Sequence, residues 1–451
     1  MVVWSRLATF LVIGYLCMTR SFAYLGIPPL QLFIGELGLA AFVLLKPRVA
    51  LGTWTASVLR PSPLNELGLA LLLFVSYGVW QVVRGVLGGS SVLHTFKYFI
   101  FNYYTIYMFL GIWVAMKIPD FLPRLVRAIA WFNGVYGLVW ILALKQTTSY
   151  LHMPGTDVQL FGQPVGSAIA ILGLCCFERN LGKVWLPLVL NIIVLLALQW
   201  RIEWLGLALG MCVWGLLTGR FGRVVAMGLA GLAVLGMIEL TGVELSGRTA
   251  KVSLSETLAR VIAPIDKELA QQLSPNAGMA AHTMEWRQKW WQGIWNSVHS
   301  DSMLAAFGHG YGFNMLSVAP MDIRYGDTEH RIPHSVFYYA LGYTGWVGVV
   351  LFALLQVAVF RLLWRAYRLT GQPIGIVWWV AGMAMCSFEA GFDTPYRAIP
   401  LYLLWGMAMA AALQREGQVQ ARLSRARLPS AAGRLAEAMP RRAASRIPAA
   451  R

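Results

Sequence analysis

The sequence has few charged residues. Only 13% of its 451 residues are Asp, Glu, Lys or Arg, and 58% are hydrophobic. A soluble globular domain has about 25% charged residues, so the deficit excludes a water-facing surface of ordinary size. Apolar runs of about 20 residues, long enough to cross a bilayer, recur from one end of the chain to the other. These features predict an all-α integral membrane protein.

Cysteine is scarce, and all five cysteines lie inside apolar segments, outside the long stretch 241–334. This placement excludes a disulfide framework and a cysteine-based metal site. His330 and His334 are four residues apart, as in some zinc sites, but Pro333 interrupts the helix that would place them on one face. We therefore expect no metal and no other cofactor.

Acidic residues are too few to balance the basic ones, and the net charge is +17. Much of the excess lies in the last 37 residues, which hold nine Arg and two Glu. A nucleic-acid interface would instead cluster basic and aromatic residues on one folded face. Residues 414–451 therefore form a basic, disordered cytoplasmic tail in our interpretation, and its partner is anionic membrane lipid and not nucleic acid.

About twelve transmembrane helices follow from the hydropathy pattern. They are expected at about 5–23, 27–45, 64–84, 97–116, 125–144, 160–177, 184–199, 202–218, 223–240, 335–360, 375–391 and 397–413. If the N-terminus is cytoplasmic, every inner turn is rich in Lys and Arg, as the positive-inside rule requires. Both termini are then cytoplasmic, and four regions result: an N-terminal bundle of about nine spans (1–240), a large periplasmic loop (241–334), C-terminal spans (335–413) and the tail (414–451).

The large loop has the features of a folded, helical segment. Ser253 and Glu256 form a capping box before an amphipathic stretch that ends near Leu273. A second helix is predicted from His282 to Trp295, with several tryptophans on one broad face. That face suits either the membrane interface or packing against the bundle.

A glycine-rich stretch lies near the end of the loop. Gly308, Gly310 and Gly312 alternate with His309 and Tyr311. The stretch does not follow a strand, which excludes a dinucleotide-binding turn. Glycines at this spacing allow either close approach of a ligand or a plain turn.

One histidine and two arginines are further candidates for chemistry. His334 follows Pro333 at the start of a predicted span, where it could be a general base or a structural residue. Arg201 and Arg287 lie on the outer side, against the positive-inside trend. Guanidinium groups match phosphate oxygens well, so these arginines suit pyrophosphate binding. Arg201 could also extend toward the interface without a ligand.

Together these motifs resemble the O-antigen ligase and polymerase family of bacterial surface-polysaccharide enzymes. The resembling residues are Trp286-Arg287 with Trp290-Trp291, the glycine turn, His334 and the stretch from Gly342 to Gly348. Two departures stand out. Ser335 follows the histidine where the family often has Asn, and Trp200 precedes Arg201 where the family often has Ser.

The resemblance implies a C-type membrane glycosyltransferase, inverting and metal-independent, in the bacterial inner membrane. Its donor would be a glycan on undecaprenyl pyrophosphate at the periplasmic face. Its acceptor would be either the lipid A core, for a ligase, or another lipid-linked glycan, for a polymerase; the sequence leaves that choice open. Surface-polysaccharide or exopolysaccharide biosynthesis, with other assembly proteins as partners, is the expected setting.

With this resemblance we expect His334 and Arg287 to be catalytic. The expected substrate-binding residues are Arg201, Arg331, His309, Tyr311, Gly310 and Gly312. A different class, a transporter or flippase for polysaccharide or lipid-linked oligosaccharide, would need charged groups inside the membrane. Glu36 and Glu389 are the acidic candidates for that alternative.

Overall fold

The structure is a computed structural model. It describes residues 1–27, 32–50, 64–154, 156, 158–241, 247, 252–263, 266–274, 277–320 and 332–427. The helices up to the long loop are α1 (Val2–Ala23), α2 (Ile34–Leu45), α4 (Asn65–Leu87), α5 (Val92–Tyr98), α6 (Ile100–Tyr103), α7 (Tyr107–Lys117), α8 (Phe121–Leu142), α9 (Ser167–Phe177), α10 (Trp185–Leu198), α11 (Arg201–Thr218) and α12 (Phe221–Thr241). The remaining helices are α13 (Leu254–Ile262), α14 (Lys267–Leu273), α15 (Ala277–Val298), α16 (Ser302–Phe307), α17 (Val336–Thr370), α18 (Ile374–Phe388) and α19 (Pro395–Arg427).

Short elements complete the described chain. Strands β1 (Gly26–Ile27) and β2 (Leu32–Phe33) pair antiparallel, with Gly26 opposite Phe33. The 3-10 turns are η2 (Tyr104–Ile106), η3 (Leu144–Ser149), η4 (Leu181–Val184) and η5 (Met315–Val318). Almost all regular structure described is therefore helical, as the composition predicts.

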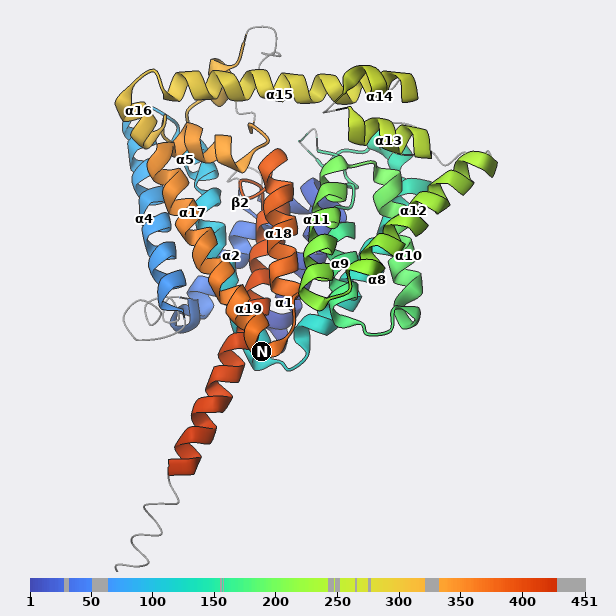
Figure 1. The fold of residues 1–451 in the computed structure, drawn as a ribbon. Helices are drawn as coiled ribbons and strands as arrows, with labels where there is room; N and C mark the ends of the chain where they lie inside the picture. Colours follow the sequence, from blue (N-terminus) through green and yellow to red (C-terminus); the bar gives the residue numbers. More distant parts are fainter. Residues whose placement is uncertain are drawn as a thin grey trace, which may run out of the picture.

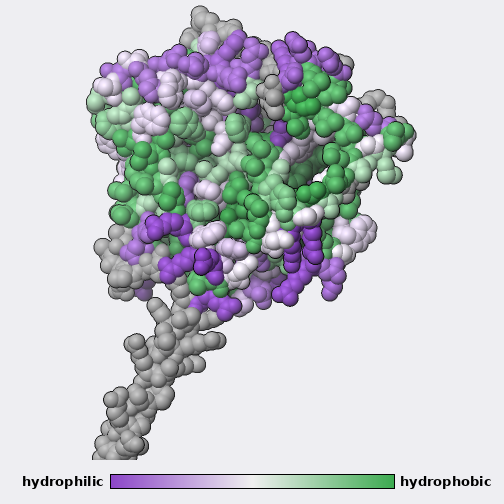
Figure 2. Space-filling view, in the orientation of Figure 1, coloured by the Kyte–Doolittle hydropathy of each residue, from purple (hydrophilic) through white to green (hydrophobic). Residues whose placement is uncertain are grey.

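The long helices stand side by side as a bundle, and α15 lies across one end of it, roughly at right angles to them (Figure 1). Helices α13, α14 and α16 lie at the same end, which we call the loop end. Helix α19 is central, because α7, α17 and α1 all pack against it. A broad apolar belt separates two polar ends on the visible surface (Figure 2). This is the surface that a bilayer requires.

Nine helical segments of the described chain are long and apolar enough to cross a membrane. Three shorter apolar helices, α2, α9 and α18, overlap the other three predicted spans. The first part of the expected span 27–45 differs, because Ile27 and Leu32–Phe33 lie in β1 and β2. The all-α membrane fold is thereby confirmed, and the count of twelve spans stays a prediction. The tail beyond Arg427 lies outside the described residues.

The long loop differs from its prediction in two respects. Ser253 caps a helix as expected, since its Oγ accepts a hydrogen bond from the Glu256 N–H at 3.1 Å. However, the Glu256 side chain turns to Arg260, 2.6 Å away, instead of capping in return. The stretch expected to end near Leu273 is divided into two helices, α13 and α14. The buried Glu256 joins them, because Ser274, just after α14, donates a hydrogen bond to it.

The tryptophan face of α15 packs mainly inward. Trp290 is fully buried, and its indole N–H donates to the Met315 carbonyl at 3.0 Å. Trp291 donates to the Pro333 carbonyl at 2.7 Å and stacks on Tyr338. Packing against the bundle, one of the two interpretations of this face, therefore holds for these two residues. The bond to Pro333 also fixes the chain directly before His334.

Candidate functional site

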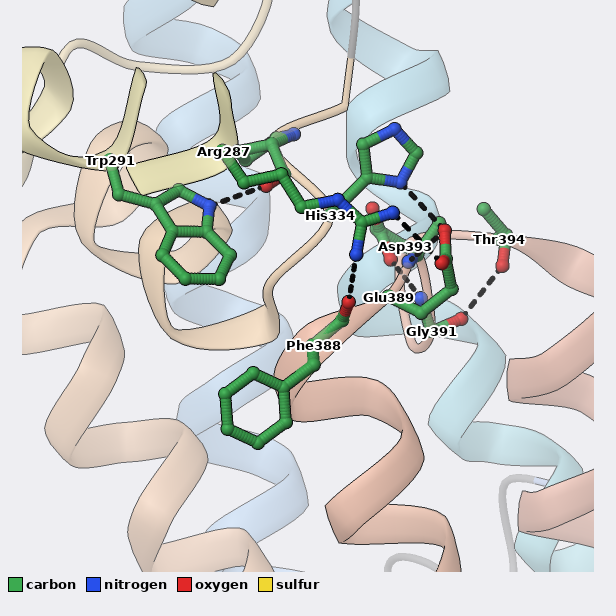
Figure 3. A network of polar contacts seen from close by, with 10 residues as sticks. Arg287, Trp291, His334, Phe388, Glu389, Gly391, Asp393 and Thr394 are labelled. Carbon is green, nitrogen blue, oxygen red and sulfur yellow. Dashed lines mark hydrogen bonds and ion pairs between the residues drawn. The ribbon is translucent and has the colours of Figure 1, made fainter. Parts of the chain in front are cut away.

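His334 and Glu389 meet at the loop end of the bundle. His334 precedes α17, and Glu389 is the first residue after α18. The two side chains are joined by a 2.8 Å contact between His334 Nδ1 and Glu389 Oε1 (Figure 3). The backbone of His334 has a φ of +54°, a left-handed conformation that is uncommon for a non-glycine residue. Such backbone strain persists only where the surroundings hold it, and it is frequent at functional sites.

Arg287 of α15 binds the same carboxylate from the other side. Its Nη2 lies 3.0 Å from Glu389 Oε2, and its Nη1 donates to the Phe388 carbonyl at 2.6 Å (Figure 3). One carboxylate therefore bridges a histidine and an arginine that come from segments far apart in the sequence. Trp286, on the same helix, places its ring 6.3 Å from that of His334. The loop helix is thus fastened directly above the end of α18.

The charges around Glu389 stabilise its ionised form. Burial alone would raise the pKa of Glu389, but the hydrogen bond from His334 and the charges of Arg287, His334 and Arg397 outweigh that effect. Together they hold the pKa of Glu389 well below its ordinary value. Glu389 is therefore a fixed negative charge at neutral pH, and it favours a proton on the ring nitrogen of His334 that faces it.

Arg201 brings a second guanidinium to this region. It is the first residue of α11, which packs along α18. The charge of Arg201 interacts with those of Arg287, Arg260 and Glu389. Arg260 is held by Glu256 and is buried. Two arginines, Arg201 and Arg287, thus gather at the loop end near one carboxylate, and such an arrangement suits an added anion with several oxygens.

A second carboxyl group lies in the loop between α18 and α19. Asp393 is buried, and its Oδ1 accepts a hydrogen bond from the Gly391 N–H at 2.6 Å (Figure 3). Its Oδ2 has no hydrogen-bond partner among the described residues. Burial raises the pKa of Asp393 to about 6, against the effect of the Gly391 hydrogen bond. One six-residue loop therefore carries two carboxyl groups whose pKa values move in opposite directions.

A buried ion pair ties α11 to α19 beneath this cluster. Glu203 Oε1 and Arg397 Nη1 are 3.2 Å apart, and their side chains are 2% and 4% exposed. The ring of Trp200 covers the Arg397 guanidinium at 5.2 Å. Because Glu203 follows Arg201 by two residues and Arg397 lies near Glu389 in sequence, the pair holds both sides of the site in register.

The glycine-rich stretch lies apart from the histidine–carboxylate contact. Tyr311 is fully buried and donates a hydrogen bond to Asn102. His309 contacts Ser297 at 3.0 Å and stacks on Phe313. Burial and the nearby Arg84 charge lower the pKa of His309 to about 4, so its ring is neutral at pH 7. The contacts found for these side chains are internal ones, and their expected role in substrate binding stays a prediction.

Two glycines of this stretch have backbone conformations that favour glycine. Gly310 and Gly312 have φ values of +87° and +91°. A Cβ on Gly312 would lie 2.6 Å from Ser90 Cβ, so its missing side chain allows close approach within the protein. Of the expected site residues, the structure therefore groups Arg287, His334 and Arg201, and it places His309, Tyr311, Gly310 and Gly312 in a separate junction.

Some of the expected chemistry falls outside the described residues. Arg331 and His330 both lie there. In the part of the chain that the structure describes, no group of three or more His, Cys, Asp or Glu side chains could hold a metal ion.

Sequence reasoning missed the role of Glu389. It noted this residue only as an acidic group near the outer end of a span, in support of a transporter. The useful signal was that the predicted topology puts Glu389 and His334 on the same side of the membrane. Topology alone does not say which helix ends are neighbours, so the contact itself could not be predicted.

Comparison with known proteins finds a family match over the central part of the chain. Residues 186–353 match the family model described as O-antigen ligase. The match includes Arg201, Arg287 and His334 and ends before Glu389. No curated protein sequence matches the chain.

The fold and the site thus define a multi-pass membrane protein with a histidine–carboxylate pair and two arginines at one end of its bundle. The match of residues 186–353 to the O-antigen ligase family model confirms the predicted resemblance to the O-antigen ligase and polymerase family. That family links the chain to enzymes that act on glycans in polysaccharide biosynthesis.

Proposed function

We propose that the chain is a membrane glycosyltransferase that moves a glycan from undecaprenyl pyrophosphate to an acceptor hydroxyl at the periplasmic face of the bacterial inner membrane. The observation that carries the proposal is the bridge of His334 and Arg287 by Glu389. Both termini are cytoplasmic in this proposal, and the loop end is periplasmic. The acceptor is a lipid A core or a second lipid-linked glycan.

The arginines bind the donor pyrophosphate. Arg287 holds Glu389 and the Phe388 carbonyl with its two Nη groups, and its buried Nε–H has no hydrogen-bond partner among the described residues. Arg201 adds positive charge from α11. Negative charge builds on the pyrophosphate as it leaves, and preorganised donors in a water-poor site stabilise that charge most strongly. The arginines supply this stabilisation, so the reaction needs no metal ion.

His334 is the general base. Because Nδ1 faces a carboxylate, it carries the proton, and Nε2 keeps the lone pair that accepts one. The acceptor hydroxyl gives its proton to Nε2 while its oxygen forms a bond to the anomeric carbon. The bond from that carbon to the pyrophosphate oxygen breaks, and its electron pair leaves with the pyrophosphate. A single displacement of this kind inverts the anomeric configuration, and Glu389 stabilises the imidazolium that forms.

The transporter alternative loses one of its two acidic candidates. A transport site is expected near the bilayer midplane, but Glu389 lies at the loop end and is bonded to His334 and Arg287. The transferase therefore accounts for more of the site.

The test is transfer by the purified protein in liposomes. The donor is an undecaprenyl-pyrophosphate-linked repeat unit, supplied with and without a lipid A core acceptor. We expect His334→Ala and Arg287→Ala to reduce transfer at least 100-fold. His299→Ala and Lys289→Ala, changes at exposed positions on or beside α15, are the matched controls and should keep it.

The products distinguish the two acceptors. A ladder on the lipid carrier would identify a polymerase, and lipid A-linked glycan would identify a ligase. Full transfer by His334→Ala and Arg287→Ala proteins that insert normally would contradict the proposal.

A further inference from the structure

Helix α17 is broken near its loop end. Gly345 has a φ of +63° and a ψ of −168°, which are not helical values, so a short segment, 336–344, is set at an angle to the long helix 346–370. The short segment begins two residues after His334. Its direction therefore determines how the histidine is presented to Glu389.

The glycine-rich stretch fills this break. The His309 N–H donates to the Gly342 carbonyl at 2.9 Å, and the Gly310 N–H donates to the Tyr343 carbonyl at 2.9 Å. In an unbroken helix these carbonyls would accept from residues four positions later. The glycine-rich stretch thus satisfies backbone groups that the break would otherwise leave unpaired inside the protein.

Two glycines make the close contact between the segments possible. A Cβ on Gly308 would lie 2.5 Å from the Tyr343 carbonyl carbon, and a Cβ on Gly345 would lie 2.5 Å from the Gly308 nitrogen. Both glycines also have positive φ values, +67° and +63°. A side chain at either position would meet rigid backbone, and it would also strain its own.

Helix α4 holds the same junction from the far side. Arg84 donates from Nη1 to the Phe307 carbonyl at 2.7 Å and from Nη2 to the Gly308 carbonyl at 2.6 Å. The fully buried Gln81 donates to the Phe307 carbonyl at 2.8 Å. One turn earlier, Tyr77 donates to the Thr344 carbonyl at 2.6 Å. Helix α4 therefore binds both segments of the junction: the start of the glycine-rich stretch and the broken part of α17.

We propose that Arg84, Gly308 and Gly345 are positioning residues: they lock the break in α17 and so fix the segment that presents His334 to Glu389. The role in catalysis rests on the proposed glycosyl transfer. Both Nη groups of Arg84 are committed to carbonyl oxygens, and its planar fork matches two acceptors at once. A lysine keeps the charge but cannot make both bonds in that geometry.

Kinetics separate positioning from substrate binding. Arg84→Lys and Arg84→Gln should both lower kcat at least tenfold, and the KM for the donor should stay within twofold of the parent value. If Arg84 instead held a phosphate, Arg84→Lys would keep most activity and Arg84→Gln would raise KM; that result would overturn the proposal. Arg361→Gln, on the exposed part of the same α17, is the control.

A distance measurement tests whether the break in α17 is held fixed, and it does not depend on glycan transfer. Spin labels at Phe337 and Val350 lie on the two sides of the break. The parent should give one narrow distance distribution, and Gly345→Ala and Arg84→Gln should broaden it. Gly371→Ala is the matched control, since Gly371 also has a positive φ, +71°, at the end of α17, with nothing within 4 Å of an added Cβ.

The results that would overturn this inference differ from the results that would contradict the proposed function. If Gly345→Ala does not insert, Arg84→Lys carries the distance measurement instead. An unchanged distance distribution in the variants would overturn the proposal that these residues fix the break in α17, whatever the activity. Broadened distance distributions in variants of a protein that transfers no glycan would support the fixed break and contradict the proposed glycosyl transfer.

Discussion

Two carboxylates at helix ends, Glu36 and Glu389, look alike in the sequence and differ in what surrounds them. Glu36 accepts hydrogen bonds from neutral groups: the Phe33 N–H at 3.1 Å and the hydroxyls of Tyr103, at 3.1 Å, and Tyr104. Glu389 is instead held by Arg287 and His334. A ring of neutral donors fixes a helix end, whereas a carboxylate between an arginine and a histidine also sets their charge and orientation.

The largest expected effect separates these two carboxylates by activity. Glu389→Gln removes the charge that orients and stabilises protonated His334, so transfer should fall by about 10²- to 10⁴-fold. Glu36→Gln should change kcat less than threefold, because its partners are structural. The measurement is initial rate in liposomes with matched protein amounts. Equal losses in the two variants would remove the distinction drawn here.

The structure also shows how far sequence reasoning reaches. Each predicted span overlaps at least one helix, because apolar runs and basic turns are local signals. Arg287 and His334 were proposed from the sequence because arginine on an outer helix and histidine at a helix start are unusual, and because both belong to the motifs that resemble the family. Glu389 was not assigned to the site, since its neighbours come from α15 and from the segment before α17. Contacts between distant helix ends depend on packing, which no local pattern specifies.

The glycine-rich stretch shows the converse limit. Alternating glycines predict either a ligand site or a turn, and sequence cannot decide between them. In the structure Gly308 lies against Gly345, where α17 is broken, although the two glycines are 37 residues apart in the sequence. Glycine is required at each of the two positions because the backbone of the other segment lies so close.

A second prediction extends the comparison to stability. Glu203→Ala would leave the buried Arg397 guanidinium without its carboxylate, and breaking such a pair costs about 3–5 kcal/mol. We expect a clear fall in the thermal midpoint of the protein in detergent. Glu203→Ala combined with Arg397→Met should recover much of the loss, because the uncompensated charge is then gone. No recovery in the double variant would show that packing, and not charge, holds these helices.

The third prediction uses the opposite pKa shifts of Glu389 and Asp393. The folded-state pKa of Asp393 is about 6, above the ordinary 3.8, so ionising it destabilises the fold. That penalty is absent below about pH 4, grows as pH rises, and is complete above about pH 6, where it is about 3 kcal/mol. The contribution of Glu389, whose pKa is lowered, is lost only as pH falls below its ordinary 4.5.

Between pH 7 and pH 5 the two contributions therefore separate. The parent should gain stability from Asp393 over this window, while the contribution of Glu389 stays constant. Asp393→Asn should not show this gain, and its thermal midpoint should approach or exceed the parent value at pH 7. The check is a series of unfolding curves from pH 7 to pH 5. A gain of the same size in Asp393→Asn would assign the pH dependence to another group.

The smallest expected effect comes from an exposed pair of the same chemistry. Glu66 and Arg361 are 3.1 Å apart, but their side chains are 56% and 66% exposed. Water screens such a pair, and it contributes about 0–1 kcal/mol. Glu66→Gln should therefore leave the thermal midpoint and the transfer rate close to those of the parent, although the Glu66–Arg361 distance is close to the 3.2 Å of the buried Glu203–Arg397 pair. If Glu66→Gln were as damaging as Glu203→Ala, burial would not be the property that separates the effects of these two ion pairs.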